Sequence, residues 1–117
     1  MQFDAQTADY RARCPRASFD VVMLDGVQVG RLYVDRRADT IHVLDITIAP
    51  AWQGHGIGSA LFAQLQAEAI DTARSISLYA EATGHAEGWY ERLGFVADAP
   101  QGVHVHMQWH PTQGVSG

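Results

Sequence analysis

The stretch IAPAWQGHGIGSAL, residues 48–61, places three glycines at alternate positions, Gly54, Gly56 and Gly58. A run of β-branched residues comes before them, and an apolar pattern with helical spacing follows. A helix that begins directly after a strand and a glycine-rich turn presents unpartnered N–H groups at the positive end of its dipole. Because the glycines have no side chains, anionic oxygens can approach those donors closely. We therefore predict a phosphate-binding turn.

Two familiar glycine motifs do not match this stretch. A dinucleotide-binding fingerprint needs a third glycine three residues after Gly56, and Ser59 stands there. A P-loop needs a lysine, and all eight basic residues of the chain are arginines. The turn is neither of these.

The residues before the turn predict an antiparallel meander. Alternating apolar residues favour strands over 17–24, 27–35 and 40–50. Asp25 and Gly26 form a tight-turn signal between the first two, and Gly30 marks a bulge in the second.

The residues after the turn change to a helical period. Apolar residues recur every four positions from Ile57 to Ala69, which predicts a helix to about residue 73 with one buried face. Residues 75–82 alternate again as a strand. The strand–helix–strand unit over 41–80 implies a right-handed crossover and parallel pairing. The fold class is therefore α/β (α+β), a mixed, mostly antiparallel twisted sheet around a central β-α-β unit.

Three further segments complete the predicted elements. A short helix over 85–92 ends at Gly94, and residues 95–97 and 103–109 form a closing hairpin. Residues 4–13 are expected to form a short helix.

Length and composition predict one cytoplasmic domain. The 117 residues carry a net charge of −5, which disfavours nucleic acid as a partner, and they contain no apolar run long enough to span a membrane. The one cysteine, Cys14, excludes an internal disulfide and fits a reducing compartment. We expect a single domain over 1–117, with a short N-terminal segment (1–16), no secretory signal and a frayed tail (111–117).

Two motifs resemble the GNAT superfamily of N-acyltransferases. The run from Gln53 to Gly58 reads Q-x-x-G-x-G and is similar to the acyl-CoA-binding motif of that family. The segment AEGWYERLGF, residues 86–95, is similar to the later helix and turn. The resemblance extends over residues 17–109. It implies transfer of an acetyl group from acetyl-CoA to a primary amine, on a small molecule or a protein, by direct attack.

The resemblance also implies how the donor binds. Backbone N–H groups of the glycine turn hold the pyrophosphate. His55 either adds a partial charge beside it or is only a tolerated residue of the loop. The pantetheine arm lies along the end of the strand over 40–50, which separates from the strand over 75–82 to admit it. The donor-binding residues implied are Thr47, Ile48, Ala49, Gln53, Gly54, His55, Gly56, Ile57, Gly58 and Ser59.

Two proton transfers complete the implied reaction. Tyr90 matches the tyrosine of the family's helix and is the candidate acid for the leaving thiolate, since a phenol stays protonated at neutral pH. Asp45 and Glu81 are the candidate bases for the incoming ammonium. The alternatives are that Tyr90 only packs in the core and that both carboxylates are solvated on an exposed face.

Two features depart from the family pattern. The sequence TGHA at 83–86 stands where the family often has an asparagine, and few residues before position 17 are available to wall the acceptor site. That site is then open, or a second subunit completes it in a homodimer. The rival hypotheses are an acyl-CoA-binding module without transferase activity and a nucleotide-binding regulator.

Three histidines near the C-terminus, His104, His106 and His110, raise the question of a metal. No acid or cysteine stands near them in sequence, and the implied chemistry needs no metal. We expect an exposed polar strand face here and no metal site.

Overall fold

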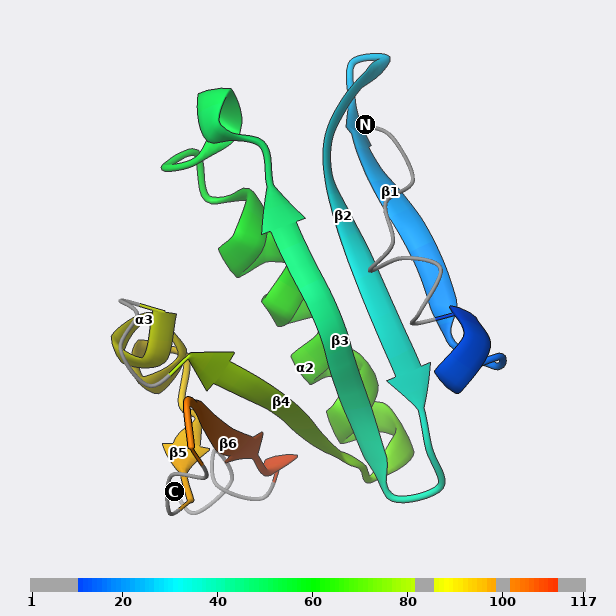
Figure 1. Cartoon of the computed structure of the whole chain (residues 1–117), viewed down its shortest axis with the longest axis vertical. Helices are drawn as coiled ribbons and strands as arrows, with labels where there is room; N and C mark the ends of the chain where they lie inside the picture. The colour runs from blue at the N-terminus through cyan, green and yellow to red at the C-terminus, as the bar shows by residue number, and fades with distance from the viewer. Residues whose placement is uncertain (1–10, 82–85, 99–101, 112–117) are drawn as a thin grey trace.

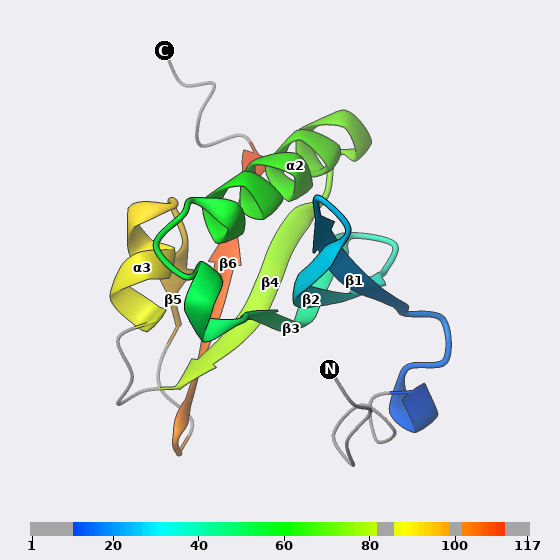
Figure 2. The ribbon, with the colours of Figure 1, turned by 90° about the horizontal axis from the view of Figure 1, so that it is seen from above.

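The structure of the protein is a computed structural model that describes residues 11–81, 86–98 and 102–111. One six-stranded sheet runs through the described part in the order β1-β2-β3-β4-β6-β5. Two helices, α2 and α3, cover the same face of this sheet (Figures 1 and 2). The elements are β1 (Ser18–Leu24), β2 (Val27–Arg36), β3 (Thr40–Ile48), the 3-10 helix η1 (Pro50–Trp52), α2 (Ile57–Thr72), β4 (Ser75–Glu81), α3 (Ala86–Arg92), β5 (Val96–Ala97) and β6 (His104–Trp109).

The predicted meander and crossover are both confirmed. β1, β2 and β3 pair antiparallel, and β3 pairs with β4 in parallel after the α2 crossover. The closing hairpin is present, but β6 lies between β4 and β5 and pairs with both. Of the helix expected over 4–13, only residues 11–13 are described, and they are helical. The tail from residue 112 and most of the TGHA segment lie outside the described residues.

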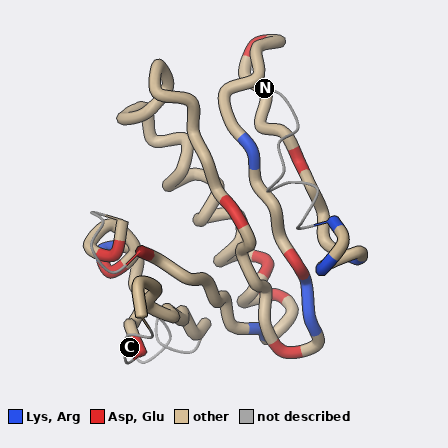
Figure 3. Tube along the Cα trace, viewed as in Figure 1, with Lys and Arg blue, Asp and Glu red and all other residues tan. Residues whose placement is uncertain are grey.

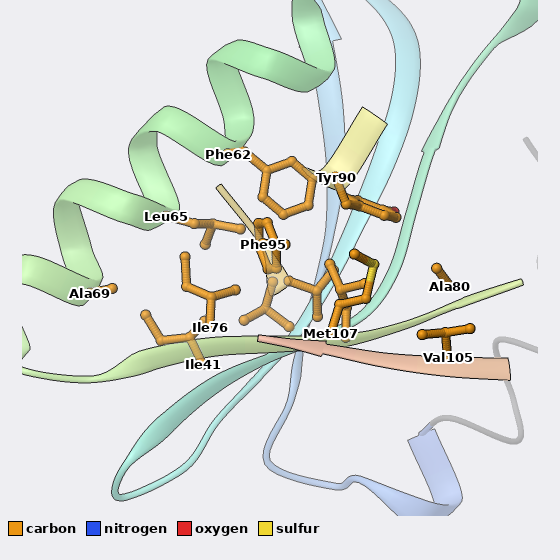
Figure 4. Packing of buried hydrophobic residues seen from close by; sticks show 13 residues of the cluster. Ile41, Phe62, Leu65, Ala69, Ile76, Ala80, Tyr90, Phe95, Val105 and Met107 are labelled. Atoms are coloured by element: carbon orange, nitrogen blue, oxygen red, sulfur yellow. The ribbon is translucent and has the colours of Figure 1, made fainter. Parts of the chain in front are cut away.

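The hydrophobic core lies between the sheet and the two helices. Alternate residues of β3, β4 and β6 point toward α2 and α3 and are almost fully buried (Figure 4). Phe62 of α2 stands at its centre, in edge-to-face contact with Tyr90 and Phe95. Burial of this apolar surface is the main stabilising contribution, and it fixes α3 against α2.

β3 and β4 stay paired over only three residues. Their register runs from Thr40↔Ser75 to His42↔Ser77 and goes no further, and Figure 1 shows the two strands diverging beyond it. The register between β2 and β3 shifts at the same level, so that Leu44 is an extra residue in β3. Because a bulge bends the strand that contains it, this bulge accounts for the separation. The separation was predicted, and the bulge was not.

Gly30 allows β2 and β3 to approach closely at the far end. A Cβ at this position would overlap the carbonyl oxygen of Thr47 in β3. The register between β1 and β2 also shifts beside Gly30, as the sequence predicts. Among the described residues, no helix has the length and apolar character needed to cross a bilayer.

Candidate active site

The turn before α2 owes its shape to two glycines. Gly54 and Gly56 have φ values of 81° and 78°, the left-handed region that other residues adopt at a cost. A Cβ at either position would meet no atom within 4 Å, so the space beside both glycines is open. Gly58 differs, because a Cβ there would lie 3.2 Å from the Trp89 ring. Gly58 therefore also serves the close packing of α2 against α3.

The start of α2 presents a row of unbonded donors. No side chain caps the helix, and its first backbone bond runs from the N–H of Ala60 to the carbonyl of Gly56. Within the described residues, no backbone hydrogen bond has an N–H of residues 54–59 as its donor. These groups, at the positive end of a 16-residue helix, form an anion-binding surface.

At the end of β3, successive residues direct their backbone N–H and C=O groups to opposite sides of the strand. The N–H of Ala49 donates to the carbonyl of Val29 in β2, so Thr47 and Ala49 direct their backbone groups toward β2. Ile46 and Ile48 direct theirs to the side from which β4 has diverged. The side chain of Gln53 already donates to the Ile48 carbonyl at 3.0 Å. The backbone groups of β3 that face this gap are therefore those of Ile46 and Ile48, and Ile46 is not among the residues that the sequence singles out.

Tyr90 belongs to the hydrophobic core, with only 9% of its surface exposed. Its ring packs against those of Phe62, Trp89 and Phe95 at centroid distances of 5.1 to 5.8 Å. Burial raises the pKa of its hydroxyl above the usual value of 10, and the negative charge of Asp45 raises it further. Tyr90 is thus held in its neutral, proton-carrying form.

Asp45 is held in a buried ion pair that the sequence did not indicate. Its Oδ2 accepts a hydrogen bond from Arg31 Nη2 at 2.8 Å, and its Oδ1 accepts one from the Thr47 hydroxyl at 2.7 Å. The two charged side chains are only 10% and 9% exposed. The pairing of Arg31 with Thr47 across β2 and β3 brings the guanidinium to this carboxylate. Asp45 is therefore a fixed, charged group close enough to Tyr90 for its field to act there.

Glu81 and His55 lie further from this arrangement. Glu81 is exposed at the end of β4, opposite His104 of β6, and makes no hydrogen bond or ion pair with Tyr90 or Asp45. His55 is exposed in the glycine turn, where its Nδ1 contacts the carbonyl of Gln53 and its ring approaches Trp52. Of the two carboxylates, Asp45 is the one whose charge raises the pKa of Tyr90.

Two of the C-terminal histidines make side-chain hydrogen bonds to nearby polar residues. His106 Nδ1 lies 2.7 Å from Asp98, and His110 Nε2 lies 2.9 Å from Gln108. His104 is exposed on the same face of β6. In the described part of the chain, no group of three or more His, Cys, Asp or Glu side chains could hold a metal ion.

Comparisons with known proteins agree with this geometry. A family model described as the acetyltransferase (GNAT) domain matches residues 3–113. None of the curated proteins matches the sequence significantly. Among solved structures, the fold is similar to the ribosomal-protein-S18-alanine N-acetyltransferase of Escherichia coli (TM-score 0.76, 19% identity, 92% of this chain and 78% of that one).

Two further structures contain a coenzyme A ligand. The PaiA N-acetyltransferase of Thermoplasma acidophilum in complex with coenzyme A has a TM-score of 0.72 at 15% identity, over 90% of this chain and 67% of that one. An acetyl-CoA-bound GNAT acetyltransferase of Elizabethkingia anophelis has a TM-score of 0.71 at 12% identity, over 92% and 83%. The structures establish the fold, and the family match establishes the relationship. The chain belongs to the GNAT family of acetyltransferases.

Proposed function

We propose that this protein transfers the acetyl group of acetyl-CoA to a primary amine, on a small molecule or a protein. One observation carries the proposal: β3 and β4 separate beside a helix whose first N–H groups are unbonded, and the buried Tyr90 lies where the charge of Asp45 acts on it. An anion site, an opening in the sheet and a proton-carrying phenol are the three parts that the reaction needs. The family match supports the same reaction.

The residues of the turn fit the diphosphate of coenzyme A. Open space beside Gly54 and Gly56 leaves room for phosphate oxygens at the donors of residues 54–59. The backbone groups of Ile46 and Ile48 that face the gap would bond to the amides of the pantetheine arm. The backbone groups of Thr47 and Ala49 face β2, so these two residues would contribute to donor binding through their side chains and by setting the spacing of Ile46 and Ile48. Bound there, acetyl-CoA supplies an activated acyl group.

The chain's own residues handle the two protons. The amine nitrogen attacks the thioester carbonyl, the carbon–sulfur bond breaks, and Tyr90 donates its phenolic proton to the thiolate sulfur. Asp45 accepts the proton that the amine gives up, directly or through water, since each carboxylate oxygen keeps a lone pair beyond its present hydrogen bond. Glu81 is the second candidate for this role. A backbone N–H at the separated edge of β3 would stabilise the oxyanion.

Turnover with a panel of amines tests the proposal. Wild-type protein with acetyl-CoA and each amine should release free thiol, and mass spectrometry should find the acetylated amine. Asp45→Asn should lower kcat for thiol release by about 100-fold, and Glu81→Gln should leave it within about twofold. Coenzyme A binding without thiol release for any amine would instead establish the rival, an acyl-CoA-binding module.

A further inference from the structure

The sheet face opposite α2, toward the viewer in Figure 1, contains a groove of about 1200 Å³. Its floor is formed by alternate side chains of β3, β4 and β6, the ones that point away from the core. One wall includes Arg13 and Cys14, and one end lies at the turns before β3 and β4. The mechanism above uses none of the side chains of the floor.

The floor of the groove is polar and internally bonded. The Ser77 hydroxyl lies 2.8 Å from His42 Nδ1 and 3.1 Å from the Thr40 hydroxyl. The Tyr79 ring lies between those of His42 and His106, at centroid distances of 5.7 and 5.0 Å. A sheet face that packs against a further protein layer carries apolar residues at such positions. This face suits a polar, hydrogen-bonding ligand instead.

The charge of the groove is opposite to that of the whole chain. Three arginines line it, Arg13, Arg37 and Arg74, against one acid, Asp39, although the chain has a net charge of −5. In Figure 3 the basic segments at the end of β2 and the start of β4 lie at the same end of the sheet. The groove therefore concentrates positive charge on an acidic protein.

Two of these arginines, Arg37 and Arg74, lie near carboxylates that do not line the groove. Glu68 accepts two hydrogen bonds from Arg36, at 2.6 and 2.9 Å, and Arg74 lies 4.0 Å from the same carboxylate. The Glu68 carboxylate thus interacts with both Arg36 and Arg74, and its interaction with Arg74 is the weaker of the two. Arg37 pairs with Asp35 at 3.0 Å.

His42 reports the field at the floor. Burial, the charge of Arg37 and that of His106 together lower its pKa to about 4, and the opposing effect of Asp35 is the smallest of the four. Among the charges that act on this ring, the effect of Arg37 is larger than that of Asp35. At neutral pH the His42 ring is uncharged, so it can hydrogen-bond a ligand without adding to that charge.

The groove also reaches the point where the strands separate. Val43 and Leu44 of β3 and Tyr79 of β4 line it, and all three lie just past the last β3–β4 pair. We propose that the groove binds the amine acceptor and selects amines that carry a carboxylate or phosphate, with Arg37 and Arg74 holding the anionic group. This inference rests on the proposed function, and it adds the substrate class.

Matched amines test the substrate class. 6-Aminohexanoate against 6-aminohexanamide, and 6-aminohexyl phosphate against 6-aminohexanol, differ mainly in the anionic group. Their long chains let the amine extend from the arginines beside the start of β3 toward Asp45. The measurement is kcat/KM for thiol release with each amine, expressed as the anionic-to-neutral ratio. Comparing this ratio between wild type and variants cancels the intrinsic reactivity of each amine. The carboxylate and phosphate pairs distinguish the two sources of the anion.

Two variants should move the ratio in opposite directions. Arg74→Gln should lower it by about tenfold, because a hydrogen-bonded charge is lost, and added salt should shrink the difference. Asp35→Asn should raise it, since Arg37 then lacks its partner. Arg16→Gln removes the same charge from an exposed residue outside the groove and should leave the ratio within twofold.

A binding experiment separates this inference from the proposed function. The anionic amines should shift the backbone amide resonances of residues 40–42 and 75–79 in NMR titrations, and the neutral partners should not. If these shifts occur without any thiol release, the groove stands as an anion site and the transferase proposal fails. Thiol release with no preference for the anionic amine, or shifts that are equal for both partners, would overturn the assignment.

Discussion

The conformations of Gly54 and Gly56 make the turn before α2 specific to glycine. Both have positive φ, and both border open space rather than packed atoms. The sequence could predict this turn because glycine spacing is a local signal that directly follows from backbone sterics. It could not predict that Gly58 packs on Trp89, since that contact depends on where α3 lies.

Gly56→Asp should weaken coenzyme A binding by about 100-fold, because a carboxylate then stands a few ångströms from the bound diphosphate. Calorimetric titration measures the dissociation constant. Gly26→Asp is the matched control: Gly26 also has positive φ and open space, but it lies in the β1–β2 turn. Equal loss of affinity in both variants would show that backbone strain, and not the anion site, is responsible.

Tyr90→Phe should lower kcat for thiol release by about 100-fold while the dissociation constant of coenzyme A stays within twofold. The pKa of Tyr90 is raised, so the wild-type enzyme should keep its acid through neutral pH and lose it only above pH 10. Rapid thiol detection measures kcat, and across pH 6 to 10 it should show no loss of rate from deprotonation of Tyr90. A variant with undiminished kcat would assign Tyr90 to packing alone.

At the scale of elements, the local patterns were sufficient for the strands and for α2 and α3, and Gly30 indicated the irregularity in β2. The four-residue spacing of α2 correctly predicts that Leu65 and Ala69 are buried. The bulge at Leu44 has no glycine or other local signal, because it depends on how β3 pairs with β2. β6 lies between β4 and β5 in the sheet. Local hairpin signals could not predict this position, because it depends on pairing with β4, which is distant in the sequence.

Gly30→Ala should destabilise the protein by about 2 kcal/mol, because the new Cβ overlaps backbone of β3 that cannot move without breaking the sheet. Denaturant unfolding measures the change in free energy. Gly88→Ala provides the opposite control: its nearest neighbour is the end of the Arg92 side chain at 3.9 Å, so helix propensity should stabilise it by up to about 1 kcal/mol. Unchanged stability in Gly30→Ala would show that the strands separate more easily than the register implies.

At the scale of the whole molecule, the order of the strands in the sheet brings together side chains from segments that are far apart in the sequence. The alternation of His104 and His106 predicts a polar strand face, and the structure places that face beside His42 and Ser77 of other strands. The ion pair of Arg31 with Asp45 likewise depends on the register of two strands. The sequence therefore predicts the donor turn and Tyr90, whereas the groove follows only from the assembled sheet.

His42 should make the stability of the whole molecule depend on pH. Its pKa is about 4 when folded and near 6.5 when unfolded, so between these values the unfolded chain binds more protons and stability falls as the pH falls. Because the groove admits some water, we expect a loss of about 1 to 2 kcal/mol from pH 7 to pH 4. In urea unfolding, His42→Gln should reduce this loss. An identical pH dependence in the variant would remove His42 as its source.

The central claim is that the N–H groups of residues 54–59 hold the diphosphate of coenzyme A. An NMR titration of the ¹⁵N-labelled protein with coenzyme A, with pantetheine as the ligand that lacks the diphosphate, tests it most directly. The account predicts that coenzyme A produces the largest, saturable shifts at the amides of residues 54–59 and that pantetheine leaves them in place. Saturable shifts confined to other residues, or none at these six amides, would contradict it.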